Sequence, residues 1–86
     1  MEETVTAAKN KVEAPKSKDK KYIKPYTTKE NLNLRSGAGV GKDIILTIPK
    51  GKTVMCYGYY TKVGSTMWLF VQYEKYAGFV SKEYLA

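Results

Sequence analysis

Two short motifs carry the side chains of this chain that are best suited to binding chemistry. The first is Asn31-Leu-Asn-Leu-Arg-Ser-Gly-Ala-Gly39 and the second is Ala77-Gly-Phe-Val-Ser-Lys-Glu-Tyr-Leu85. The first motif offers side-chain amides and a guanidinium, which suit peptide carbonyls or a carboxylate. Tyrosine and tryptophan side chains lie between and within the motifs and offer flat surfaces with polar edges. These residue types predict a binding surface rather than a catalytic centre.

The composition excludes most classes of catalytic site. The 86 residues include no histidine, so Ser-His-Asp and Cys-His nucleophile systems and imidazole metal ligands cannot form within the chain. The single cysteine, Cys56, can form neither an internal disulfide nor a CxxC zinc site. As a small apolar side chain in a strand it is expected to be buried. We therefore expect no catalytic residue, no metal site and no cofactor.

The glycine-rich segment Gly37-Ala-Gly-Val-Gly-Lys42 is similar to a phosphate-binding loop but lacks its essential residues. Counting back from Gly41 and Lys42 places Ser36 where the first glycine should be, and Asp43 replaces the hydroxyl residue that would hold magnesium. A strand pattern follows the segment, whereas a phosphate-binding loop leads into a helix. Nucleotide binding is not expected.

From Tyr26 onward the sequence has the alternation and the turn residues of a small β protein. The strand candidates are residues 32–35, 44–48, 53–63, 67–73 and 79–80. Gly58 indicates a bulge or bend in the longest of them. Pro49-Lys-Gly51 is typical of a turn, and residues 81–85 are expected to form a single helical turn. Five short strands joined by tight turns predict an all-β fold, a small, strongly bent antiparallel barrel.

Residues 1–25 lack the pattern of folded structure. Val5, Ala8 and Val12 form only a thin apolar stripe, and a lysine-rich run follows them. Such a segment buries too little apolar surface to offset its ordering entropy. We expect a flexible, basic, disordered linker over residues 1–25, followed by one domain over residues 26–86. The acidic start without an apolar core is unlike a secretory signal, and no membrane span is expected.

The order of the motifs resembles that of the bacterial SH3 (SH3b) family. That family typically runs LNVRSGPS, I-xx-L-xx-G-xx-V, GW-xx-V and GWV-xx-xYL. The similar segments here are LNLRSGAG from Leu32, IPKGKTV from Ile48, the strand with Trp68, and GFVSKEYL from Gly78. The resemblance covers about residues 27–86. Phe79 stands where the family usually has tryptophan, and Thr66-Met67 precede Trp68 in place of the usual glycine.

The resemblance implies an SH3-like barrel that is itself no enzyme. Members of the family usually accompany cell-wall hydrolases or surface proteins and recognise peptidoglycan. Relatives bind stem or cross-bridge peptides in a groove near the loop that follows the LNVR strand. The expectation is therefore a monomeric targeting module of an extracellular, cell-wall-associated protein of the Gram-positive type, whose export signal lies outside this chain.

Strand alternation separates side chains expected inside the barrel from those available to a ligand. The residues expected to point inward are Leu32, Leu34, Val54, Cys56, Leu69, Val71 and Val80. The candidate ligand-binding residues are Asn31, Asn33, Arg35, Ser36, Tyr57, Tyr59, Trp68, Phe70, Phe79 and Tyr84. Each aromatic ring has a structural alternative, which is packing at the rim of the barrel. Arg35 has the alternative of an ion pair with Glu30 or Asp43.

The net charge of +7 favours polyanionic surroundings, and its lysines are spread along the chain. Teichoic acid phosphates would give a non-specific supplement to a weak peptide site. One alternative is a module for proline-rich or extended peptides, although residues 36–42 lack the acid that such SH3 domains present to a basic ligand residue. The other, less favoured, is a basic nucleic-acid-binding barrel, which predicts steeply salt-dependent binding.

Overall fold

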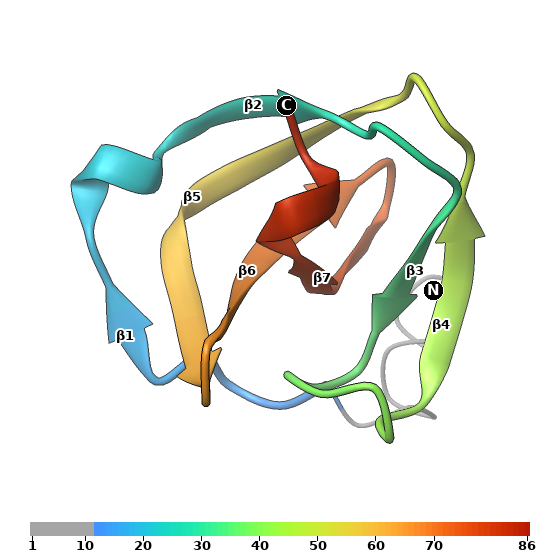
Figure 1. The fold of residues 1–86 in the computed structure, drawn as a ribbon. Helices are drawn as coiled ribbons and strands as arrows, with labels where there is room; N and C mark the ends of the chain where they lie inside the picture. The colour runs from blue at the N-terminus through green and yellow to red at the C-terminus, as the bar shows by residue number, and fades with distance from the viewer. Residues whose placement is uncertain (1–11) are drawn as a thin grey trace.

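Antiparallel strands form almost all of the regular structure in the computed structural model, which describes residues 12–86 (Figure 1). The elements in chain order are β1 (Ser17–Lys18), η1 (Lys20–Tyr22), β2 (Lys24–Thr27), β3 (Leu32–Arg35), β4 (Ile44–Ile48), β5 (Thr53–Val63), β6 (Thr66–Tyr73), β7 (Tyr76–Ser81) and η2 (Lys82–Tyr84). The strand order is β1-β5-β6-β7-β3-β4, and β2 also pairs with β5. All pairs are antiparallel, and the sheet curls on itself into a small barrel. The predicted all-β fold and its final helical turn, now the 3-10 turn η2, are confirmed.

The inner face of the sheet forms the core, as strand alternation predicts. All seven side chains expected to point inward are buried. Tyr26, Ile48 and Leu85 complete the same cluster. Because period-two alternation places every second residue on one face, the register of a half-buried strand is readable from its apolar residues.

Two glycines shape the sheet where a side chain would not fit. Gly58 has φ +97°, and the pairing of β5 with β6 shifts register around it, so the predicted bulge is confirmed. Gly78 lies where β7 passes β3. A Cβ atom at Gly78 would lie 2.6 Å from the carbonyl oxygen of Arg35 and 3.1 Å from the Leu34 side chain. This close approach brings the two strands that carry the motifs together and places Arg35 beside Phe79 of β7.

Within residues 12–25 the structure differs from the expected linker. Ser17 and Lys18 pair with Tyr60 and Tyr59 of β5, and η1 and β2 follow directly. Backbone hydrogen bonds to the exposed edge of β5, together with the edge-to-face contact of Tyr22 and Tyr60 at 5.2 Å, order this stretch. Such backbone pairing leaves no apolar pattern in the sequence. Val5 and Ala8, with the rest of residues 1–11, lie outside the described residues.

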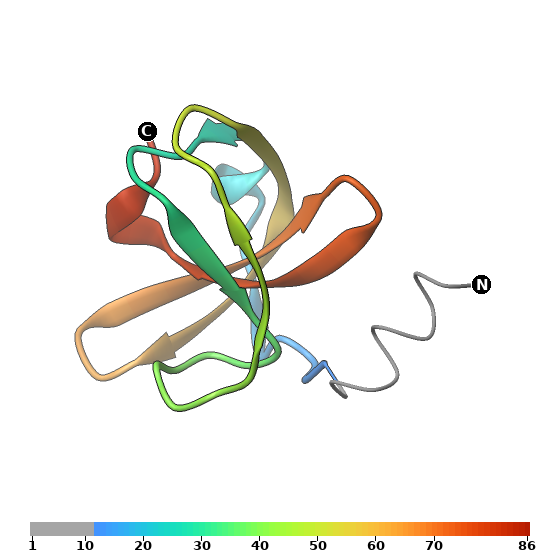
Figure 2. The same cartoon turned by 90° about the vertical axis from the view of Figure 1, so that its right-hand side faces the viewer.

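Residues 12–16 run along one end of the barrel, from the side of β5 to the end of β3 (Figure 1). The Lys16 amide donates to Thr61 Oγ1 at 3.0 Å. The Glu13 amide donates to the Ser36 carbonyl at 2.7 Å, and its carboxylate pairs with Lys42 at 2.7 Å. These contacts tie the segment to the glycine loop, residues 36–42, which projects beyond β3 and β4 in Figure 2. Among the described residues, no helix has the length and apolar character needed to cross a membrane.

Candidate ligand-binding cleft

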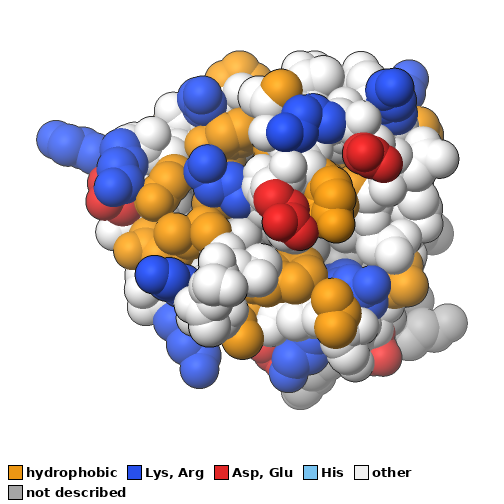
Figure 3. All heavy atoms as spheres, in the orientation of Figure 1, with side chains coloured by type: hydrophobic (Ala, Val, Ile, Leu, Met, Phe, Trp, Pro, Cys, Tyr) orange, Lys and Arg blue, Asp and Glu red, His pale blue; other side chains and the backbone are white. Residues whose placement is uncertain are grey.

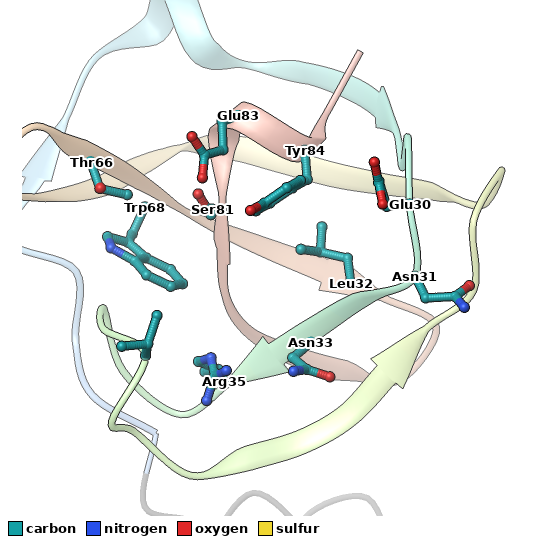
Figure 4. Close-up of a pocket in the computed structure, with 11 residues that line it drawn as sticks. Glu30, Asn31, Leu32, Asn33, Arg35, Thr66, Trp68, Ser81, Glu83 and Tyr84 are labelled. Carbon is teal, nitrogen blue, oxygen red and sulfur yellow. The ribbon is translucent and has the colours of Figure 1, made fainter.

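A cleft of about 380 Å³ opens on the outer side of the sheet, between β3, the glycine loop, the ends of β6 and β7, and η2 (Figure 4). It is lined by Glu30, Asn31, Leu32, Asn33, Arg35, Val40, Thr66, Trp68, Ser81, Glu83 and Tyr84. The cleft thus combines residues of both sequence motifs. It forms because β3 and η2 face each other across the end of β7.

The β3 wall carries polar side chains that are already held in place. The Asn33 side-chain oxygen accepts a hydrogen bond from Thr47 Oγ1 at 2.8 Å, and the Asn31 side-chain oxygen accepts one from the Lys50 amide at 3.0 Å. Arg35 donates through Nη1 to the Lys42 carbonyl at 3.0 Å, and within residues 12–86 it forms no ion pair with Glu30 or Asp43. A guanidinium has five N–H donors, so Arg35 retains donors for a ligand.

The opposite wall combines an aromatic side chain with a buried hydroxyl. Trp68 lies between Thr61 and Ser81 in cross-strand register and is 6 % exposed. Ser81 ends β7 and is the N-cap residue of η2, yet its side chain makes no capping hydrogen bond. The Ser81 hydroxyl is buried and has no hydrogen-bond partner among the described residues. Figure 4 shows it directed into the space between Trp68 and Tyr84.

Acidic side chains gather on the η2 side of the cleft. The charge of Glu83 raises the pKa of Tyr84, and a hydrogen bond with that carboxylate, burial and the charge of Glu30 add to the rise. Glu30 and Glu83 lie on the same side of the cleft as Tyr84, whereas Arg35 lies on the other side (Figure 4). Within residues 12–86 neither carboxylate forms an ion pair with a lysine or arginine. The cleft therefore has a negative side and a positive side.

The structure brings together five of the ten candidate residues named from the sequence. These five are Asn31, Asn33, Arg35, Trp68 and Tyr84. Ser36, Tyr57, Tyr59, Phe70 and Phe79 do not line the cleft. Ser36 is buried and uses its amide and carbonyl within the fold, in bonds to Asp43 and Glu13. Tyr57 and Tyr59 are exposed on β5, away from the cleft, where Lys18 Nζ lies 4.9 Å from the centre of the Tyr59 ring.

Phe79 is a correction to the expected exposed set. Its ring is on the outer face, as its parity predicts, but it is only 1 % exposed. It packs edge-to-face against Phe70 with ring centres 5.0 Å apart. Phe70 and Phe79 are cross-strand partners in the pairing of β6 with β7. Alternation identifies the face of a strand but not what covers that face.

Sequence reasoning missed six of the lining residues: Glu30, Leu32, Val40, Thr66, Ser81 and Glu83. Ser81 and Glu83 stand inside the second motif, and Ser81 shares the parity of Phe79 along β7. Because Phe79 is expected to point outward, the same alternation predicts that Ser81 points outward too. Val40 and Glu30 reach the cleft only through loops, whose paths alternation does not predict.

Two features bear on metal-ion and thiol chemistry in the described part of the chain. Residues 12–86 contain no group of three or more Cys, Asp or Glu side chains that could hold a metal ion. Cys56 is buried in the core, and burial raises the pKa of its thiol. A thiol with a raised pKa is a poor nucleophile at neutral pH.

Comparisons of the chain with protein-family models, with curated proteins and with solved structures found no match.

Proposed function

We propose that this chain is a non-catalytic binding module of the bacterial SH3 type. In this proposal it holds a peptidoglycan stem or cross-bridge peptide in the cleft and so targets an attached hydrolase or surface protein to the cell wall. The single observation that supports it most is the meeting of Asn33 and Arg35 with Trp68 and Tyr84 around one cleft. Those side chains supply hydrogen-bonding groups on one wall and aromatic surface on the other.

The chemistry of the cleft suits a flexible, polar peptide. Such a ligand needs hydrogen-bond partners and flat aromatic surface more than a deep apolar cavity. The polar groups of Asn31 and Asn33 are held by Lys50 and Thr47, so little side-chain entropy is lost when a ligand binds. A small open cleft of this kind gives a weak monovalent interaction. Weak binding is sufficient for a tethered domain, because tethering raises the effective concentration of the attached protein at its target.

Lysines outside the cleft supply the second part of the proposal. Figure 3 shows Lys and Arg side chains around the face that carries the cleft. Attraction to teichoic acid phosphates would hold the module near the wall without contributing to specificity. An extracellular or cell-wall location belongs to the same proposal.

A second candidate is a module for proline-rich or extended peptides of other proteins. Two acidic residues, Glu30 and Glu83, lie beside Tyr84 in the cleft and favour it. They supply the acid that is absent from residues 36–42 and that such domains use to receive a ligand arginine or lysine. The same acids oppose a nucleic-acid site in the cleft, because they would repel phosphates.

Sedimentation with insoluble cell walls tests the proposed function. The purified chain is mixed with Gram-positive walls before and after removal of teichoic acid, beside a labelled oligonucleotide and a proline-rich peptide. We expect co-sedimentation with both wall preparations, and loss of it for Trp68→Ala and Asn33→Ala. Tyr57→Ala is the matched control, because Tyr57 is an aromatic residue 50 % exposed outside the cleft. Circular dichroism checks that each variant is folded.

The outcomes separate the candidates. Failure to sediment with any Gram-positive wall rules out the cell-wall module. Sedimentation that disappears with teichoic acid leaves only the charge attraction. Binding of the proline-rich peptide without wall binding assigns the second candidate, and oligonucleotide binding that weakens steeply with salt assigns a nucleic-acid role.

A further inference from the structure

The unpartnered Ser81 hydroxyl is the feature of the cleft that the fold itself does not explain. Buried hydroxyl groups are nearly always hydrogen-bonded, and a serine at an N-cap position usually bonds to an amide of the turn that it begins. Ser81 has the N-cap position of η2 and is 5 % exposed, but its hydroxyl makes no such bond. Instead the side chain is directed into the cleft (Figure 4). The Ser81 hydroxyl therefore has its hydrogen-bonding capacity free for a ligand atom in the cleft.

The charges around Ser81 indicate which kind of ligand atom lies nearby. Glu83 follows Ser81 by two residues in η2, and Glu30 lies on the same side of the cleft. Two of the eight acidic residues of a chain with net charge +7 are thus placed beside one small cleft. Two carboxylates on one side of a cleft make that side attractive to a cation. Tyr84, the neighbour of Glu83 in the chain, supplies no positive charge.

We infer that the η2 side of the cleft, formed by Glu30, Ser81, Glu83 and Tyr84, is a site for a primary ammonium group, with the rest of the ligand extended toward Arg35. This inference rests on the proposed function only in placing a peptide in the cleft. The three N–H donors of an ammonium suit the Ser81 hydroxyl and the Glu83 carboxylate, and the charge of Glu30 adds to the attraction. Arg35 on the far side receives a backbone carbonyl or a carboxylate further along the ligand. The ligand is therefore bound in one direction, with its amino group toward η2.

Trp68 fits this arrangement. Its indole lies beside Ser81, its partner on β7, and borders the same cleft as Arg35 (Figure 4). An extended peptide with small side chains can lie against such a ring, and the ring faces attract a cation as well. A primary ammonium can come from two sources, the amino terminus of a peptide or a lysine-type side chain. The experiment distinguishes them.

Binding of synthetic peptides, followed by NMR chemical-shift titration of the ¹⁵N-labelled chain, tests the inference. The probes are Ala-Gly-Ala-Gly-Ala with a free amino terminus, the same peptide N-acetylated, and an N-acetylated peptide with lysine at its centre. We expect the free peptide to bind at least about tenfold more tightly than the acetylated one, because charge-assisted hydrogen bonds are lost on acetylation. Recovery of affinity by the lysine peptide assigns the side chain as a source of the ammonium; no recovery assigns the terminus.

Two sets of variants locate the effect. Glu83→Gln and Glu30→Gln each are expected to reduce the preference for the free peptide several-fold, while Glu74→Gln, in the turn between β6 and β7, leaves it unchanged. Ser81→Ala is expected to weaken binding of the free peptide and to keep or raise the stability of the fold, because it removes a buried hydroxyl without a partner. A residue with only a structural role would not give that pair of results.

Equal binding of free and acetylated peptides, or no binding of any probe at millimolar concentration, overturns the inference. Retention of the preference in both glutamate variants also overturns it. These failures are separate from failure of the proposed function. A chain that sediments with walls but ignores acetylation keeps the wall-binding function and loses the ammonium site. A chain that prefers the free peptide but does not sediment keeps the site and loses the function.

Discussion

The cleft and the surface formed by β1, η1, β2 and β5 both carry aromatic and charged side chains, but they arrange them differently. We call the second surface the lysine–tyrosine side. It is defined by three pairs in which a lysine ammonium lies over a tyrosine ring. The Nζ atoms of Lys18, Lys21 and Lys24 lie 4.9, 5.3 and 4.9 Å from the centres of the Tyr59, Tyr22 and Tyr26 rings. Among the described residues, no lysine lies over Trp68 or Tyr84 in the cleft.

The difference shows that an exposed aromatic residue is not by itself a binding residue. A ring covered by a lysine of its own chain has one face already occupied by a cation. In the cleft, Tyr84 stands beside carboxylates and is 40 % exposed, whereas Trp68 borders the cleft with only 6 % of its surface exposed. Figure 3 shows the same contrast in charge, with acidic side chains near the middle of the viewed face and basic ones around them. Local surroundings, not ring type, separate the two regions.

The largest expected effect is a difference in the free energy of unfolding between variants of Phe79 and Tyr57. Strand alternation alone predicts that both rings point outward. Phe79→Ala is expected to lower the free energy of unfolding by about 3–5 kcal/mol, because the ring is buried and packs on Phe70. Tyr57→Ala is expected to change it by less than about 0.5 kcal/mol, because Tyr57 is half exposed. Urea denaturation measures both. Similar losses for the two variants would remove the distinction between a covered and an open outer face.

The next effect concerns Gly78, which keeps the two sides of the cleft close. Gly78→Ala places a Cβ atom 2.6 Å from the Arg35 carbonyl oxygen and forces β3 and β7 apart. We expect a loss of about 1–3 kcal/mol in the free energy of unfolding, together with weaker binding in the cleft. Gly41→Ala in the glycine loop is the control, since a Cβ there meets nothing within 4 Å. Unchanged stability of Gly78→Ala would show that the strands can separate without cost.

A smaller effect tests the segment of residues 12–16, which joins the cleft region to the lysine–tyrosine side. Thr61→Val keeps the shape of the buried side chain but removes the oxygen that accepts from the Lys16 amide. The expected loss is about 1 kcal/mol, with faster hydrogen exchange at the Lys16 amide. Thr53→Val, at the exposed start of β5, serves as the matched control. Unaltered exchange at Lys16 in Thr61→Val would mean that this bond does not hold the segment.

The smallest effect belongs to the lysine–tyrosine side. Lys18→Ala is expected to cost about 0.5–1 kcal/mol at most, because cation–π contacts at exposed sites are weak. It should leave the discrimination between free and acetylated peptides in the cleft unchanged. Denaturation at low and high salt and the same peptide titration measure both quantities. A strong loss of peptide binding in Lys18→Ala would place the ligand on this side rather than in the cleft.

Some positions in the fold and in the cleft can be predicted from the sequence, and others cannot. Period-two alternation predicts Leu32, Leu34 and Val80 in the core, Gly58 predicts a bulge in the longest strand, and the structure confirms both. The residues of β1 escaped prediction because backbone pairing with β5 requires no side-chain pattern. In the cleft, Asn33 and Trp68 could be named in advance, whereas Glu30 could not, because only the loop between β2 and β3 brings it there.

By itself the sequence determined the fold class, the inward face of each main strand and the turns, because these depend on residue spacing and on backbone preferences within a few residues. Only the tertiary structure decided which outward residues share a surface. Phe79 and Trp68 point outward from adjacent strands and both are largely buried, but only Trp68 borders the cleft. That outcome depends on contacts between segments far apart in the chain, such as Lys16 with Thr61, and no local spacing encodes them. The partnerless hydroxyl of Ser81 emerged in the same way, since it exists only where β7 and η2 meet the cleft.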